Sequence, residues 1–118
     1  MNSRIKDCVK CYYLYGCSGS ILMNYRDIIG LSEEEALELA RPFLGGKMIK
    51  CGALLAAEEV LKRTRPDKIE EFENRFLEKN HSLNCRELKG LTGGKLLRTC
   101  SGCIEDSCTL LEDYLESR

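Results

Sequence analysis

Apolar residues recur every three or four positions along most of the chain, and no stretch alternates polar and apolar residues long enough to predict a strand. The first predicted helix carries the apolar positions Ile5, Cys8, Val9 and Tyr12. The second carries Ile21, Leu22, Tyr25, Ile28 and Ile29. Gly16 interrupts the pattern between them, and Cys17 stands where it resumes.

The middle of the chain contains the clearest helix start. Ser32 and Glu35 have the spacing of a capping box, so a helix is predicted to begin there and to run to about Arg41. Pro42 and the glycine pair at 45–46 then end it. A further helix is predicted from Cys51 onward, with this apolar face: Ala53, Leu54, Ala57, Val60 and Leu61.

The remaining third also follows helical spacing. Pro66 is suited to a first helical turn, and the next helix is predicted to carry Ile69, Phe72, Phe76 and Leu77. Residues 85–95 are predicted to form a short turn of helix between loops. The last helix is predicted to have a buried stripe, with Cys103 on its flank: Leu97, Cys100, Ile104, Cys108, Leu111 and Leu115. The sequence therefore predicts an all-α fold, a compact bundle of about five to six helices.

Length and charge limit the function classes. At 118 residues the chain is predicted to form one domain, residues 1–118. The 18 Lys and Arg against 19 Asp and Glu leave a net charge of −1, which does not favour nucleic acid as a partner. No apolar run is long enough for a membrane span or a secretory signal, so a cytoplasmic protein is expected.

Cysteine is the unusual component of this sequence. There are eight: Cys8, Cys11, Cys17, Cys51, Cys85, Cys100, Cys103 and Cys108. Such a set indicates either disulfides or thiols kept for redox or metal chemistry. Cys8 and Cys11, like Cys100 and Cys103, have the spacing of dithiol pairs and of half a metal ligand set, or are simply buried thiols.

Cys17 and Cys51 are each predicted to stand at the beginning of a helix. Free backbone amides and the positive end of the helix dipole lower the pKa of a thiol there, and the thiolate is the reactive form. Lys47 and Lys50 are expected to strengthen the effect at Cys51. The alternative interpretation is that Cys51 is a small apolar residue at a tight helix contact beside Gly52.

The order of these segments resembles a known family. Cys17, the approach "FLGG", the triplet "CGA" at 51–53, "NCRELKG" and a cysteine leading a final helix resemble the C_GCAxxG_C_C family, whose members are described as redox-active. The resemblance runs from about Gly16 to Leu115 and assigns the family cysteines to Cys17, Cys51, Cys85 and Cys100. The chain departs from the family pattern at Ala56, where the motif ends in glycine.

Three functions are consistent with these residues. The first is a small thiol redox protein in which Cys17, Cys51, Cys85 and Cys100 converge for dithiol and disulfide exchange with an unidentified redox partner protein. The second uses the same four thiolates to hold a metal, an iron–sulfur cluster or zinc. The third is a non-catalytic helical interaction module, a homodimer through the tyrosines at 12, 13 and 15. His81, the single histidine, is predicted to be solvated and not a base for Cys85.

Overall fold

The fold is all-α, as predicted. The computed structural model describes residues 3–46, 50–90 and 95–116, and within these ranges the only β-type pairing is an isolated bridge between Lys50 and Asn84. The α-helices are α1 (Ser3–Lys10), α2 (Tyr12–Tyr25), α3 (Glu33–Ala40), α4 (Gly52–Thr64), α5 (Ile69–Asn80), α6 (Cys85–Leu88) and α7 (Cys100–Glu116). Two 3₁₀ segments, Arg41–Gly46 and Pro66–Lys68, follow α3 and precede α5. The described residues thus form seven helices, where five to six were predicted; the short α6 matches the predicted helical turn.

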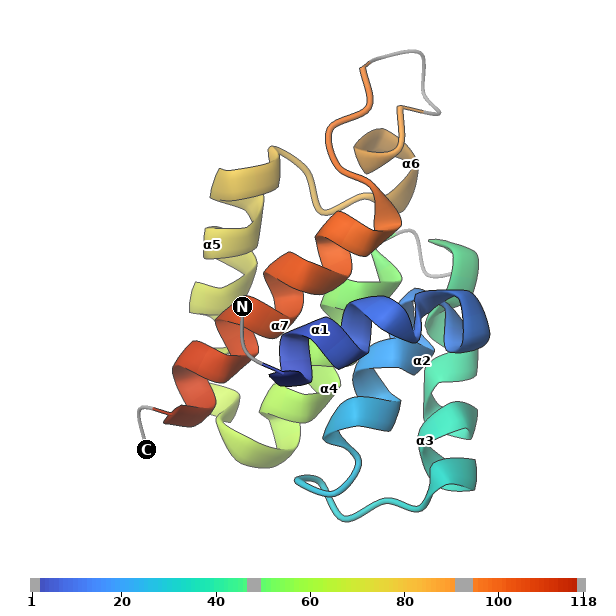
Figure 1. Ribbon diagram of the computed structural model, residues 1–118. Helices are drawn as coiled ribbons and strands as arrows, with labels where there is room; N and C mark the ends of the chain where they lie inside the picture. Colours follow the sequence, from blue (N-terminus) through green and yellow to red (C-terminus); the bar gives the residue numbers. More distant parts are fainter. Residues whose placement is uncertain (1–2, 47–49, 91–94, 117–118) are drawn as a thin grey trace.

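Helices α2, α4 and α7 form the centre of the bundle. Figure 1 shows α7 running diagonally across the molecule with α1 crossing in front of it, while α3 and α5 lie at opposite sides. Helix α4 packs against both α2 and α7, and α1 packs against α7 and α2. Residues from the beginning, middle and end of the chain therefore meet in one hydrophobic core.

The start of α3 confirms the predicted capping box. The Ser32 hydroxyl accepts a hydrogen bond from the Glu35 amide at 3.2 Å, and the Glu35 carboxylate accepts one from the Ser32 amide at 3.0 Å. Two backbone donors that have no partner within the helix are thereby satisfied. The local sequence fixes this helix end without help from the core.

Gly16 is the second position where the sequence dictates the backbone. Its φ of 77° and ψ of −176° break α2 into two parts, and Leu44 lies 2.6 Å from where a Cβ would be. Only glycine adopts such angles in so close a contact without strain. The helix resumes at Cys17, as predicted, and this thiol therefore begins a helical segment.

Helix α4 is buried along most of its length because its core face is built from small residues. Gly52, Ala53, Ala56 and Ala57 are all buried, together with the larger Leu54, Val60 and Leu61. A Cβ on Gly52 would lie 2.5 Å from both the Cys17 sulfur and the Phe43 carbonyl oxygen. The small side chains let α2 and α4 approach closely, which also brings the thiols of the two helices together.

Two helix boundaries were predicted wrongly. Helix α2 ends at Tyr25, and Ile28 and Ile29 follow in a turn that packs against the core without being helical. Leu97 lies before α7, where its amide pairs with the Leu88 carbonyl at 2.8 Å, and its side chain is 40 % exposed. Helical spacing continued through these loop residues, so the pattern alone could not mark the ends.

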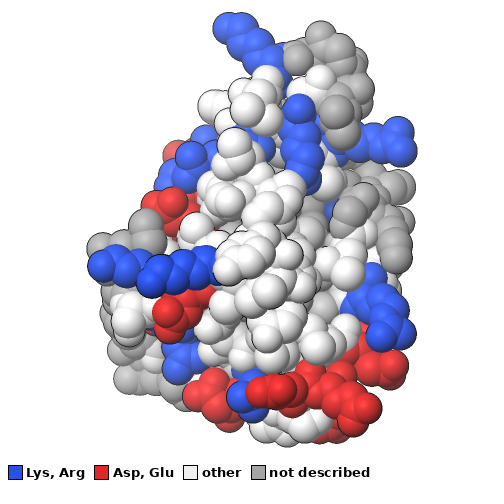
Figure 2. Space-filling model, turned by 45° about the vertical axis from the view of Figure 1, so that its right-hand side comes forward, with Lys and Arg blue, Asp and Glu red and all other residues white. Residues whose placement is uncertain are grey.

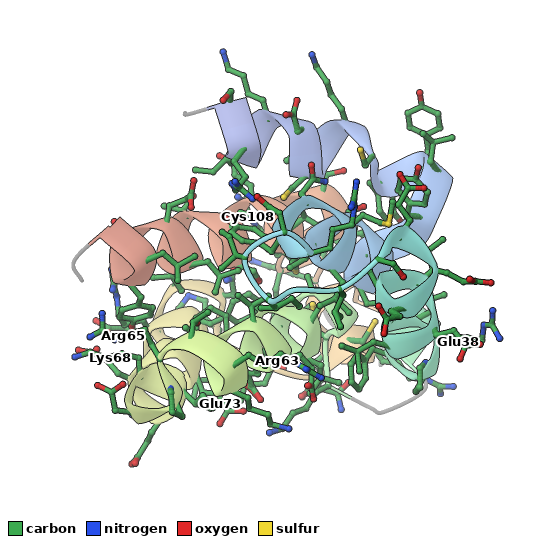
Figure 3. The ribbon with its side chains drawn as sticks, turned by 90° about the horizontal axis from the view of Figure 1, so that it is seen from below. Glu38, Arg63, Arg65, Lys68, Glu73 and Cys108 are labelled. Carbon is green, nitrogen blue, oxygen red and sulfur yellow. The ribbon has the colours of Figure 1, made fainter. Side chains whose placement is uncertain are left out.

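Charge is unevenly distributed over the surface. The face in Figure 2 has acidic side chains gathered at its lower end and basic ones toward its upper end, with an uncharged region between them. In Figure 3 the side chains of Glu38, Arg65 and Lys68 lie at the periphery, whereas Cys108 lies among the helices. None of the helices in the described ranges has the length and apolar character needed to cross a bilayer.

Candidate thiol site

A pocket of about 420 Å³ contains three thiols. It is lined by Tyr12, Gly16, Cys17, Leu44, Cys85, Arg86, Lys89 and Cys100. Cys17, Cys85 and Cys100 belong to α2, α6 and α7, so residues more than 80 positions apart in the chain meet here. We call the three thiols with Lys89 the thiol pocket.

Each thiol of the pocket stands at the beginning of a helical segment. Cys17 follows the kink at Gly16, and Cys100 is the first residue of α7. Cys85 is the first residue of α6, where the Asn84 side chain accepts hydrogen bonds from the next two backbone amides at 2.9 and 3.2 Å. The segments that precede these helices therefore place the three thiols in one pocket.

Lys89 is the main charged group among these thiols. Its ammonium group donates a hydrogen bond to the Cys85 sulfur at 2.7 Å and also contacts the Cys100 sulfur. Burial acts to lower the pKa of Lys89, but the two sulfur contacts prevail and raise it above its ordinary value. A fixed positive charge beside sulfur favours the thiolate, which is the form that attacks disulfides. A role for Lys89 was not predicted from the sequence, although Cys85 and Lys89 have the i, i+4 spacing of one helical face.

Tyr12 forms part of the pocket wall and was also missed. Its hydroxyl is hydrogen-bonded to Cys100, and this contact, with burial, raises the pKa of Tyr12 to about 12. Its neighbours Tyr13 and Leu14 are 83 % and 63 % exposed. The tyrosine cluster is therefore divided between the pocket and the surface, and the homodimer through it stays a prediction.

Cys51 lies behind the pocket and is paired with Cys103. Both thiols are almost completely buried, and the Cys103 thiol donates a hydrogen bond to the Cys51 sulfur. Cys103 was predicted on the flank of the apolar stripe of the last helix, and this flank is buried as well, since Cys103 is 1 % exposed. Because α4 packs closely against α7, positions beside the expected stripe are covered as well.

The pKa of Cys51 is lowered from 9.0 to about 7. The hydrogen bond from Cys103 contributes most; the backbone amides of Leu54 and Ala53 and the charge of Lys89 act in the same direction, against the effect of burial. The hydrogen bond to Cys51, with burial, raises the pKa of Cys103. The proton of this pair is therefore held on Cys103, and the negative charge on Cys51.

The predicted source of positive charge at Cys51 needs correction. Lys50 forms an ion pair with Glu73 at 2.8 Å. Lys47, the other predicted residue, lies outside the described residues. Among the described residues, Lys89, which is 38 positions further along the chain, supplies the positive charge that lowers the pKa of Cys51.

The four cysteines assigned by the family resemblance are thus placed in two adjoining layers. Cys17, Cys85 and Cys100 line the pocket, and Cys51 lies beneath it with Cys103. The Cys17 sulfur lies against Gly52, the residue after Cys51, so the two layers touch there. The arrangement provides thiols, a fixed cation and a stabilised anion within one connected region.

The remaining predictions about thiols and bases have mixed outcomes. Cys8 contacts Cys108 and Cys103 contacts Cys51, so both CxxC segments make their sulfur contacts outside their own motifs. Cys11 is half-buried. His81 is exposed and ends α5 with a φ of 67°, in agreement with a solvated residue at a helix end.

The metal alternative lacks a ligand set in the part of the chain that the structure describes. No three side chains of His, Cys, Asp or Glu in residues 3–46, 50–90 and 95–116 lie close enough together to hold a metal ion. A larger hollow of about 720 Å³ lies beside α3, but its lining contains Glu34, Glu35, Glu38 and Arg63 and no thiol. The thiol pocket is therefore the better candidate for chemistry.

Comparison with known proteins gives one match. The model of the family described as "Putative redox-active protein (C_GCAxxG_C_C)" matches residues 15–114. No curated protein and no solved structure matches the chain. The matched range contains all the thiols of the pocket and the Cys51–Cys103 pair.

Proposed function

Because the chain belongs to the C_GCAxxG_C_C family, we propose that it exchanges thiols and disulfides with a partner protein at the thiol pocket. The observation that carries the proposal is the position of Lys89. One ammonium group contacts the sulfurs of both Cys85 and Cys100 in an open pocket. A half-buried cation between two thiols stabilises the negative charge that develops on sulfur during exchange.

The exchange takes place in two steps. The Cys85 thiolate attacks one sulfur of a disulfide in the partner and forms a mixed disulfide, and the other partner sulfur leaves as a thiolate and takes up a proton. The Cys100 thiolate then attacks the Cys85 sulfur, forms the Cys85–Cys100 disulfide and releases the second partner thiol. Two electrons pass from the dithiol of this protein to the partner disulfide, and two protons follow.

The other residues of the site have supporting roles. The Tyr12 hydroxyl, which is hydrogen-bonded to Cys100, keeps this thiol in place until the mixed disulfide forms. Cys17 lines the same pocket and provides a second resolving thiol. Cys51 and Cys103 form an inner pair that returns the pocket to its dithiol state by exchange through Cys17, whose sulfur lies against α4. Two electrons then pass from the inner pair to the pocket, and the disulfide ends between Cys51 and Cys103.

Trapping of the mixed disulfide tests this proposal. The reduced protein is mixed with oxidised glutathione, quenched with N-ethylmaleimide and mapped by mass spectrometry. In wild type a Cys85–Cys100 disulfide is expected, and in the double variant Cys17→Ser, Cys100→Ser, which lacks both resolving thiols, the reaction is expected to stop with glutathione attached to Cys85. Cys11→Ser is the matched control and should behave as wild type, since Cys11 lies outside the pocket.

The result that would overturn the proposal is equally definite. If Cys85 and Cys100 keep free thiols while other cysteines react, or if Cys85→Ser leaves the rate of exchange unchanged, the pocket is not the exchange site. The interaction-module alternative predicts the latter outcome. No observation among the described residues favours the metal alternative as a second candidate.

A further inference from the structure

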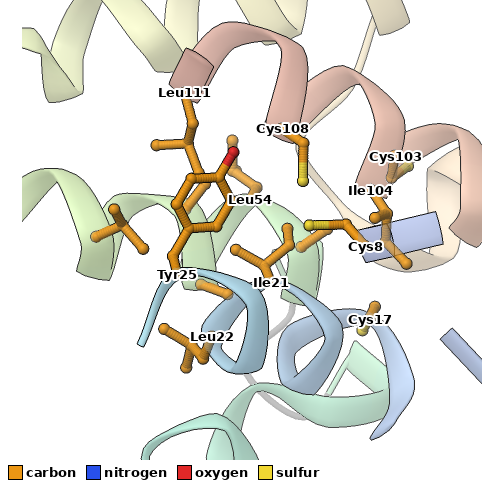
Figure 4. Packing of buried hydrophobic residues seen from close by; sticks show 14 of the residues in the cluster. Cys8, Cys17, Ile21, Leu22, Tyr25, Leu54, Cys103, Ile104, Cys108 and Leu111 are labelled. Carbon is orange, nitrogen blue, oxygen red and sulfur yellow. The ribbon is translucent and has the colours of Figure 1, made fainter. Parts of the chain in front are cut away.

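A second thiol pair lies outside the pocket, in the core. Cys8 belongs to α1 and Cys108 to α7, and both are completely buried. Figure 4 shows their two sulfurs pointing toward each other between the helices. The thiols are hydrogen-bonded neighbours although 100 positions separate them in the chain. Neither takes part in the exchange proposed above.

The surroundings hold this pair in place. Ile21, Ile104 and Leu111 pack around it with the Tyr25 ring, and all four are fully buried. The hydrogen bond with Cys8 and the burial raise the pKa of Cys108 well above its ordinary value. Two thiols that a close-packed core holds with their sulfurs facing each other are placed to form a disulfide.

We propose that Cys8 and Cys108 are a redox site of their own, whose disulfide clamps α1 onto α7. The oxidant is a disulfide of low molecular weight. Cys8 attacks one of its sulfurs and releases one thiol, and Cys108 then attacks the Cys8 sulfur and releases the second. Two electrons move from the pair to the oxidant, and the two thiol protons end on the released thiols.

Access to the pair requires α1 to open, and its place in the fold makes this feasible. Helix α1 has eight residues and buries only Ile5 and Cys8. Short elements with few buried side chains open at a lower free energy than the core. Cys8 moves out with α1 and reacts first, and Cys108 reacts when the helix returns.

The clamp has a consequence for the thiol pocket. Helix α1 leads within two residues to Tyr12, which is hydrogen-bonded to Cys100 in the pocket wall. A Cys8–Cys108 disulfide would fix α1 to α7 and would thereby restrain Tyr12 in the pocket wall. Helix α1 could then no longer open.

Peptide mapping can identify the disulfide in the unmodified chain. Trypsin isolates Cys8 in residues 7–10, and cleavage after Glu105 separates Cys108 from Cys100 and Cys103. The full-length protein is equilibrated with oxidised glutathione, in buffer and in urea below the unfolding midpoint so that opening of α1 is not limiting. We expect the two peptides joined, and a Tm about 10 °C higher than that of equally treated Cys8→Ser.

The controls separate the clamp from other disulfides. Cys11→Ser keeps both members of the pair and should form the joined peptides as wild type does. Residues 7–10 recovered with a free thiol, or carrying glutathione, after the pocket thiols have oxidised would overturn the proposal. Joined peptides without a rise in Tm would overturn the clamp. The peptide map of wild type decides the disulfide even if Cys8→Ser fails to fold.

Discussion

The thiol pocket and the Cys8–Cys108 pair show how one residue type acquires opposite properties in a single bundle. In the pocket, Cys85 and Cys100 share an ammonium group; Cys100 is half-buried, and Cys85 is 5 % exposed. At the other site, Cys8 and Cys108 are completely buried and face each other among apolar side chains and the Tyr25 ring. The first site places a cation beside sulfur, whereas at the second a thiol partner and burial raise the pKa of Cys108. The difference lies in the neighbours, not in the cysteines.

The Cys51–Cys103 pair shows that burial alone does not decide the outcome. Cys51 is 2 % exposed, yet its pKa is lowered to about 7. A thiol donor, the amides at the start of α4 and Lys89 together outweigh the desolvation of the anion. Cys108, equally buried, has a pKa raised by a thiol partner and by burial. The two pKa values shift in opposite directions because Cys51 stands at the start of a helix near Lys89, whereas Cys108 lies within α7.

The largest expected effect is on the rate of alkylation. With iodoacetamide at pH 7.5, Cys85 and Cys100 should react at least about hundredfold faster than Cys8 and Cys108, because the buried pair must first be exposed by opening. Time-resolved labelling followed by peptide mass spectrometry measures all four rates in one sample. Equal alkylation rates in the thiol pocket and at the Cys8–Cys108 pair would show that the two environments do not differ in thiol reactivity.

Replacement of Lys89 by methionine removes the cation and keeps most of the side-chain volume. We expect alkylation of Cys85 to slow about tenfold, since a charge-assisted hydrogen bond to the sulfur is lost. The rate at Cys108 should not change. Lys95→Met is the matched control, because Lys95 is exposed and does not line the pocket. A Cys85 rate that is the same in both variants would show that Lys89 does not activate it.

In the reduced protein, we expect the Cys8–Cys108 pair to contribute to the free energy of unfolding more than to thiol reactivity. Cys8→Ala removes a completely buried sulfur and should lower the free energy of unfolding by about 1 to 2 kcal/mol. Urea denaturation of the reduced protein measures this. The half-buried Cys11 gives the control, Cys11→Ala, with an expected loss below about 0.5 kcal/mol. If Cys8→Ala also slowed the alkylation of Cys85 and Cys100, the two sites would not be independent.

The smallest effect is a pH dependence of stability from Cys51. Its pKa is lowered from 9.0 to about 7, so its contribution is absent below pH 7, grows between pH 7 and 9 and is complete above pH 9. Compared with Cys51→Ser, wild type should gain about 1 kcal/mol in free energy of unfolding from pH 7 to pH 8.

The comparison with Cys51→Ser is needed because another group titrates in the same range. Burial and the neighbouring Glu73 raise the pKa of Glu58 to about 8, so its contribution to stability falls as the pH rises toward 8. This effect is common to both proteins and cancels in the difference. A difference that stays constant between pH 7 and 8 would contradict the lowered pKa of Cys51.

The sequence by itself determined the local elements of this protein. Helical spacing, the capping box at Ser32 and the interruption at Gly16 depend on residues a few positions apart, and each is present in the structure. The placement of Cys17 and Cys51 at helix starts followed from the same short-range rules. Local backbone preferences hold whatever the rest of the chain does, which is why these features could be predicted.

Only the tertiary structure decided which sulfur faces which neighbour. The pairing of Cys51 with Cys103, that of Cys8 with Cys108 and the contact of Lys89 with Cys100 all join residues from different segments of the chain. Spacing along the chain had suggested other pairs and another cation. The close packing of α4 against α2 and α7, which small residues permit, sets these contacts and with them the charge state of each thiol.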